Sequence, residues 1–281
     1  MSARPSPVRA VKHRLRAQPA SDGAGVKLTR VIGTRQFDGL DPFLMLDEFG
    51  SDRPGDYLAG FPEHPHRGFE TVTYMLDGRM RHRDNAGNEG LLEPGSVQWM
   101  TAGRGILHSE MPEQVEGLMR GFQLWVNLPA RDKMTAPRYQ EFPASAIPAT
   151  ELAPGATAKV IAGRVGAVEG PVRAEATQAV YVDLVLAAGA TAVVPLPEGH
   201  NAFAYVYEGA TRIGDEPIAR GELAVLETTG EFHVVAGEAG ARLILVAGRP
   251  LNEPVAKYGP FVMNTQAEII QAIHDFQAGR F

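Results

Sequence analysis

Two short segments of the chain each carry a pair of metal-binding side chains at the same spacing. His64 and His66 lie two residues apart, and so do His108 and Glu110. In an extended strand, side chains two residues apart point to the same face. If the two strands meet, three imidazoles and one carboxylate face a common pocket. The sequence therefore predicts a metal site carried by β-strands.

Glycine and proline are frequent, which favours many turns over long helices. The chain has 31 glycines and 21 prolines in 281 residues. Short apolar runs separated by turn signals continue from Val26 to Leu128 and resume at Val160. This pattern predicts an all-β fold that closes as a sandwich or a small barrel. The runs most typical of strands are 69–76, 96–100, 122–128, 180–186, 203–207, 223–226 and 243–246.

A proline-rich region from Pro129 to Pro154 separates two halves that share this strand pattern. Because 281 residues are long for one compact domain, we expect two β domains, 1–135 and 136–281. A weak internal repeat relates the segment after His200 to the segment after His66. The second copy lacks the paired histidines, so we expect a metal site in the N-terminal domain only.

Only the end of the chain has a helical pattern. Thr265 and Glu268 have the spacing of a capping box, apolar side chains share one face after them, and Gly279 stands where the helix would stop. We expect a short C-terminal helix that packs by its apolar face.

Charge and composition exclude several classes of protein. The net charge of −6 argues against direct binding to nucleic acid. Cysteine is absent, so histidine and carboxylate are the strong metal ligands that remain. The basic N-terminal tail, which includes Arg4, lacks the apolar core of a signal peptide, and no run reaches the roughly 20 apolar residues that span a bilayer. We expect a cytoplasmic protein, with an edge strand near Val11.

The ligand chemistry narrows the metal without fixing it, because imidazole binds iron, nickel, copper and zinc. Three histidines and one carboxylate would leave two adjacent positions open on a six-coordinate ion. A tetrahedral zinc would instead be closed and structural. Open coordination favours catalysis or sensing.

Several nearby residues have two interpretations. Glu70 lies an even number of residues from His66 and competes with Glu110, although we prefer Glu110 as the ligand and Glu70 as a supporting residue. Arg67 and Arg104 either attract an anionic or phenolic ligand or simply cap turns and pair with acids. The aromatic and apolar residues that either line a pocket or belong to the core are Trp99, Met100, Phe122 and Trp125. The histidines without a paired spacing, to which we assign no metal role, are His82, His200, His233 and His274.

Four long motifs resemble the pirin family of the cupin superfamily. They are LDPFLMLDEF at 40–49, HPHRGFETV at 64–72, QWMTAGRGILHSEMP at 98–112 and GPFVMNT at 259–265. The resemblance implies two stacked cupin-type β-barrels (jelly rolls), with a metal in the N-terminal barrel only. The residues matching the family's ligands are His64, His66, His108 and Glu110.

The resemblance also implies a chemistry. Iron(II) is the expected metal, and family members are similar to dioxygenases that open the flavonol quercetin and release carbon monoxide. In that reaction Glu110 would accept the proton of the flavonol hydroxyl before dioxygen attacks the ring. The expected partners are a flavonol-like small molecule and dioxygen, without nucleic acid or membrane.

Two other functions stay open on the same site. The family includes proteins that resemble redox-sensitive transcription cofactors and bacterial members linked to metabolic enzymes, so a regulatory protein partner is the main alternative. In a third interpretation, the metal only stiffens the barrel.

Overall fold

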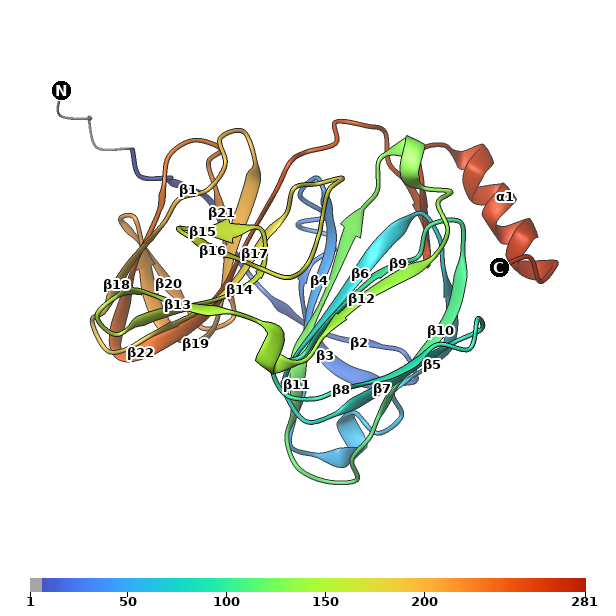
Figure 1. Cartoon of the computed structure of the whole chain (residues 1–281), viewed down its shortest axis with the longest axis horizontal. Coiled ribbons are helices and arrows are strands. Elements are labelled where there is room, and N and C mark those ends of the chain that lie inside the picture. Colours follow the sequence, from blue (N-terminus) through green and yellow to red (C-terminus); the bar gives the residue numbers. More distant parts are fainter. Residues whose placement is uncertain (1–6) are drawn as a thin grey trace. The chain divides into compact units, whose positions relative to one another are not determined.

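The alternating segments form antiparallel sheets in the computed structural model, which describes residues 7–281 (Figure 1). Arg4 of the predicted basic tail lies outside the described residues. The strands divide into two compact units. The histidine unit comprises residues 18–145 and 251–281, and the second unit comprises residues 7–17 and 146–250.

The histidine unit contains two large antiparallel sheets, a small hairpin and the only α-helix among residues 7–281. The seven-stranded sheet runs in the order β12 (Arg138–Phe142), β9 (Val97–Thr101), β6 (Phe69–Asp77), β11 (Met119–Asn127), β4 (Phe43–Ser51), β3 (Val26–Ile32) and β2 (Gln18–Asp22). The four-stranded sheet runs in the order β5 (Phe61–His66), β10 (Ile106–Pro112), β7 (Met80–Asp84) and β8 (Glu89–Leu92). The remaining elements of this unit are η1 (Pro54–Asp56), η2 (Ala130–Asp132), β23 (Ala256–Tyr258), β24 (Phe261–Met263) and α1 (Gln266–Gln277).

The second unit is built on one nine-stranded antiparallel sheet. Its main path runs in the order β1 (Val11–Arg16), β21 (Glu222–Leu226), β19 (Asn201–Ile213), β22 (Phe232–Gly248), β17 (Val180–Leu186), β14 (Ala156–Ala162) and β13 (Ala149–Ala153). Off this path, β18 (Thr191–Val194) pairs with β22 and β20 (Glu216–Ala219) pairs with β19. A separate hairpin joins β15 (Arg164–Val165) to β16 (Val168–Glu169), and η3 (Ala144–Ala146) lies where the chain passes from one unit to the other.

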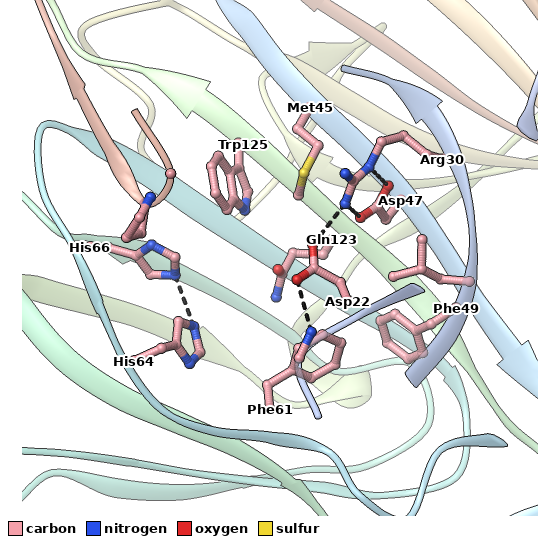
Figure 2. A pocket seen from close by; sticks show the side chains of 14 residues that line it. Asp22, Arg30, Met45, Asp47, Phe49, Phe61, His64, His66, Gln123 and Trp125 are labelled. Carbon is pink, nitrogen blue, oxygen red and sulfur yellow. Dashed lines mark hydrogen bonds and ion pairs between the residues drawn. The ribbon is translucent and has the colours of Figure 1, made fainter. Parts of the chain in front are cut away.

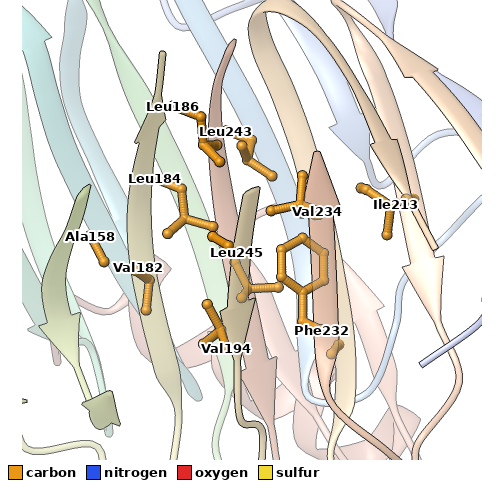
Figure 3. Close-up of a cluster of buried hydrophobic side chains, with 14 of the residues drawn as sticks. Ala158, Val182, Leu184, Leu186, Val194, Ile213, Phe232, Val234, Leu243 and Leu245 are labelled. Carbon is orange, nitrogen blue, oxygen red and sulfur yellow. The ribbon is translucent and has the colours of Figure 1, made fainter. Parts of the chain in front are cut away.

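Hydrophobic side chains fill the core of the second unit. Val182 and Leu184 on β17 alternate with residues on the other face of the strand and meet Leu243 and Leu245 on β22 (Figure 3). Phe232 packs into the same cluster. Close packing of this kind is what a period-two apolar pattern produces when one strand face is buried.

The units differ in their bounds from the predicted division at residues 135 and 136. The N-terminal strand β1 pairs with β21, with Leu15 opposite Leu223, so it completes the sheet of the second unit. The C-terminal segment from Leu251 joins the histidine unit. The crossing between Ser145 and Ala146 falls inside the predicted proline-rich region. The bounds of the two units depend on strand pairing between segments that are distant in the sequence. Such pairing cannot be predicted from composition.

The C-terminal helix has the predicted capping box. The hydroxyl of Thr265 accepts a hydrogen bond from the backbone N–H of Glu268, and the Glu268 carboxylate accepts one from the backbone N–H of Thr265. Ile269 and Ala272 on α1 are buried with Phe261 and Met263. No helix within residues 7–281 is long and apolar enough to cross a membrane.

Candidate metal centre

Three histidines converge on one point in the histidine unit. His64 and His66 lie on β5, and His108 lies on the neighbouring strand β10, directly opposite His64. One ring nitrogen of each histidine lies within 4.8 Å of the others. The three residues could therefore hold a metal ion, as their spacing in the sequence predicts.

The hydrogen bonds of His64 prepare its ring for a metal. Nδ1 lies 2.8 Å from the carbonyl oxygen of Pro62, which can only accept, so Nδ1 carries the proton. In the neutral ring Nε2 then keeps its lone pair. This Nε2 lies 3.0 Å from Nε2 of His66 (Figure 2). Both nitrogens of the buried His108 ring lack a hydrogen-bond partner among the described residues. A metal ion satisfies such a set of convergent nitrogens.

Burial keeps two of these rings neutral. The pKa of His108 falls to about 4 because the side chain is desolvated. Burial also lowers the pKa of His66 well below its ordinary value, and the neighbouring His108 and His64 lower it further. Because imidazole binds metal in its neutral form, these two ligands are ready at neutral pH.

Glu110 is buried near the histidines, but both oxygens of its carboxylate accept hydrogen bonds from other side chains. Oε1 accepts a hydrogen bond from Thr73 at 2.9 Å, and Oε2 accepts one from Gln123 at 2.8 Å. A bulge between His108 and Glu110 interrupts the pairing of β10 with β5. The group of atoms within 4.8 Å contains the three histidines, and the Glu110 carboxylate lies outside it.

Glu70, the rival carboxylate, lies in a different environment. Its Oε1 accepts a hydrogen bond from Thr101 at 2.6 Å, and burial raises its pKa. It lies outside the histidine group as well.

The two arginines near the motifs have different surroundings. Arg67 is buried, donates from Nε to the carbonyl oxygen of Arg104, and pairs from Nη1 with Asp275 of α1 at 2.7 Å. Its guanidinium also stacks on the ring of Phe281 at 4.3 Å. Arg104 is exposed and lines a separate groove beside Tyr139. Arg67 therefore ties α1 to the turn after the histidines.

The remaining candidates divide between the core and the site. Among the aromatic residues considered from the sequence, Trp125 lines the cavity described below, whereas Trp99 and Phe122 are fully buried. His82 is buried and bonds through Nε2 to Glu141 at 2.7 Å, outside the three-histidine group.

A cavity of about 410 Å³ opens beside the histidines, within the size range of small-molecule sites. His64 and His66 form one wall, and Gln123 and Trp125 form others (Figure 2). Pro260 also lines the cavity. Three charged residues also line it: Asp22, Arg30 and Asp47. We did not identify these three from the sequence, because Arg30 and Asp47 become neighbours only through the register of β3 with β4.

Comparison with known proteins agrees with this architecture. The family models Pirin and Pirin C-terminal cupin domain match residues 25–126 and 181–281. A relative from Pseudomonas aeruginosa, provisionally named quercetin 2,3-dioxygenase, is 55% identical over 272 residues, which are 93% of this chain and 94% of the relative. A pirin-like protein from Caulobacter vibrioides is 52% identical over 276 residues, 98% of this chain and 100% of the relative. The crystal structure of quercetin 2,3-dioxygenase from Acinetobacter baumannii has a TM-score of 0.91 and 35% identity, covering 98% of this chain and 99% of that one.

The fold and the histidine cluster define a protein with two cupin domains, one of which carries a site that could bind a metal. The chain belongs to the pirin family. Both the fold class and the family resemblance predicted from the sequence are confirmed.

Proposed function

We propose that this chain is an iron-binding, cytoplasmic dioxygenase that cleaves flavonols, of the quercetin 2,3-dioxygenase type. The observation that carries the proposal is the convergence of three histidine nitrogens beside a cavity of about 410 Å³, which two of the three rings, those of His64 and His66, line. The names of the Pseudomonas relative and of the Acinetobacter structure support the same reaction.

His64, His66 and His108 would hold the iron. Glu110 is the proposed fourth ligand. When bound, iron(II) would supply a Lewis acid for the flavonol hydroxyl and a source of electrons for dioxygen. Each oxygen of the Glu110 carboxylate accepts one hydrogen bond and keeps a further lone pair, with which it would bind the ion once the side chain moves toward the histidines.

Glu110 is also the proposed proton acceptor. Thr73 and Gln123 hold its carboxylate in one orientation, and from there it would accept the proton of the flavonol hydroxyl. Phe61 and Trp125 give the cavity apolar walls against which a planar ring can lie and from which water is displaced.

Oxygen consumption tests this function. The protein is reconstituted anaerobically with ferrous iron and then mixed with dioxygen, with and without quercetin. We expect uptake that requires both iron and quercetin, is absent in His66→Ala, and is retained in His13→Ala, whose side chain is exposed on β1. A sample shown to contain iron that takes up no oxygen with quercetin would refute the proposal.

A further inference from the structure

The cavity has a second polar wall that the metal chemistry does not use. Arg30 on β3 and Asp47 on β4 are directly opposed in the sheet, and Asp22 ends the neighbouring strand β2. All three line the same cavity as His64 and His66. In Figure 2, Arg30 and Asp47 lie at the opposite side of the cavity from the two histidines, and Asp22 lies nearer its middle.

The two carboxylates accept hydrogen bonds from only two of the three nitrogens of the Arg30 guanidinium. Nε and Nη2 donate to the two oxygens of Asp47 at 2.9 and 2.8 Å, and Nη2 also donates to Asp22 at 2.8 Å. Nη1 has no acceptor among the described residues, so its two N–H groups remain for a ligand.

The carboxylates keep acceptor capacity too. Asp22 Oδ1 accepts one hydrogen bond, from the backbone N–H of Gly23 at 2.8 Å, and the side chain is half exposed. Two carboxylates and one guanidinium sum to one negative charge. Such a group attracts hydroxyl donors and repels an anionic ligand end.

Between the two polar walls the lining is mostly apolar, with the side-chain amide of Gln123 as its polar member. Met45 and Trp125 lie between the histidines and Arg30 in Figure 2, and Phe49 and Phe61 also line the cavity. The indole N–H of Trp125 is buried without an acceptor among the described residues. The cavity therefore fits a flat ligand with a polar group at each end and a hydrogen-bond acceptor between them.

We infer that Asp22, Arg30 and Asp47 form a subsite for the ring of a flavonol that lies farthest from the histidines, and that they select flavonols with adjacent hydroxyl groups on this ring. One hydroxyl donates to the Asp22 carboxylate, and the oxygen of the other accepts from Arg30 Nη1. This inference rests on the proposed function. An ion pair that only stabilised the barrel would treat all flavonols alike.

Flavonols that differ only in this ring test the subsite. Quercetin has two adjacent hydroxyls on it, kaempferol one and galangin none. Dissociation constants are measured anaerobically on the metal-loaded protein by quenching of tryptophan fluorescence, and kcat/KM is measured by oxygen uptake. For quercetin, we expect Asp22→Ala to raise the Kd and to lower kcat/KM by about tenfold, which is the size of one hydrogen bond to a charged group. For galangin, both quantities should change by less than about twofold.

Asp22 suits this test because its exposed side chain can be changed without leaving a buried charge. Asp38→Ala is the matched control, since Asp38 is exposed and outside this cavity, and it should leave both ligands unchanged. If Asp22→Ala changes the Kd and kcat/KM of quercetin and galangin by the same factor, the subsite is refuted while the dioxygenase activity stands. If no flavonol binds or drives oxygen uptake in the wild type, both proposals fall.

Discussion

The Nε2 atoms of His64 and His66 lie 3.0 Å apart. Two nitrogens bound at about 2.1 Å to one ion are roughly 3.0 Å apart at neighbouring corners of an octahedron and roughly 3.4 Å apart in a tetrahedron. The separation is near both values. One ion can therefore bind the two rings at neighbouring positions.

Metal removal should lower the thermal stability of the wild type. A bound ion stabilises the folded state by about 2.7 kcal/mol at a hundredfold excess over its Kd, which corresponds to a fall in Tm of roughly 5–10 °C on chelation. In His108→Ala the Tm should not respond to the chelator, and elemental analysis should find no metal. An equal response in the variant would mean that the ion binds elsewhere.

The metal-free protein should lose stability as the pH falls from about 6.5 to 4. The folded state lowers the pKa of His108 to about 4, so the unfolded chain binds more protons across this window and is favoured by acid. The effect of His108 alone is on the order of 3 kcal/mol. Urea unfolding across this pH window should show a smaller loss of unfolding free energy in metal-free His108→Gln than in the metal-free wild type. Parallel curves for the two proteins would contradict a neutral, buried His108.

Replacing Glu110 by Gln should remove a base while keeping the volume of the side chain. General-base catalysis contributes typically 10²–10⁴-fold, so kcat with quercetin should fall by at least about a hundredfold. Circular dichroism checks that the fold is kept. The exposed Glu63→Gln provides the control on the same strand as His64. Turnover close to the wild-type rate would exclude Glu110 as the proton acceptor.

Lys133 should be important for the stability of the histidine unit. Its buried Nζ donates to the carbonyl oxygens of Gly68 and Val262 and to the side chain of Asn127. Lys133→Met leaves these buried acceptors unpaired, at a cost of about 2–4 kcal/mol. Lys257→Met, which breaks only the exposed pair with Asp38, should cost about 1 kcal/mol or less by the same denaturant measurement. Equal costs would contradict this assignment.

Asp275 should control how firmly α1 is held. The guanidinium of Arg67 holds the pKa of this carboxyl well below its usual range, so the pair is ionised at neutral pH. Asp275→Asn removes the charge opposite a buried guanidinium, and amide hydrogen exchange in α1 should become faster. His274→Gln, an exposed neighbour, should leave the exchange unchanged. Unaltered protection in Asp275→Asn would show that apolar packing alone holds the helix.

Local patterns in the sequence predict the strands and the histidine cluster, because both depend on a period of two residues. The run 122–128 falls largely within β11, and the histidines of the two pairs converge as their spacing predicts, once the pairing of β5 with β10 has placed His108 opposite His64. That Glu110 completes the metal site stays a prediction. The opposite wall of the cavity, with Arg30 and Asp47, depends on the register of β3 with β4. That register includes a bulge after Arg30, which no local sequence pattern predicts. Likewise, no local pattern predicts the ion pair between Arg67 and Asp275, which are 208 residues apart in the sequence.

Gly259 and Pro260 line the same cavity as His64 and His66, although almost two hundred residues separate them in the sequence. During synthesis on a ribosome, the histidines emerge long before these two residues do. The pocket is therefore incomplete on the nascent chain, and the finished protein rather than the growing one is the species that can bind a ligand in it.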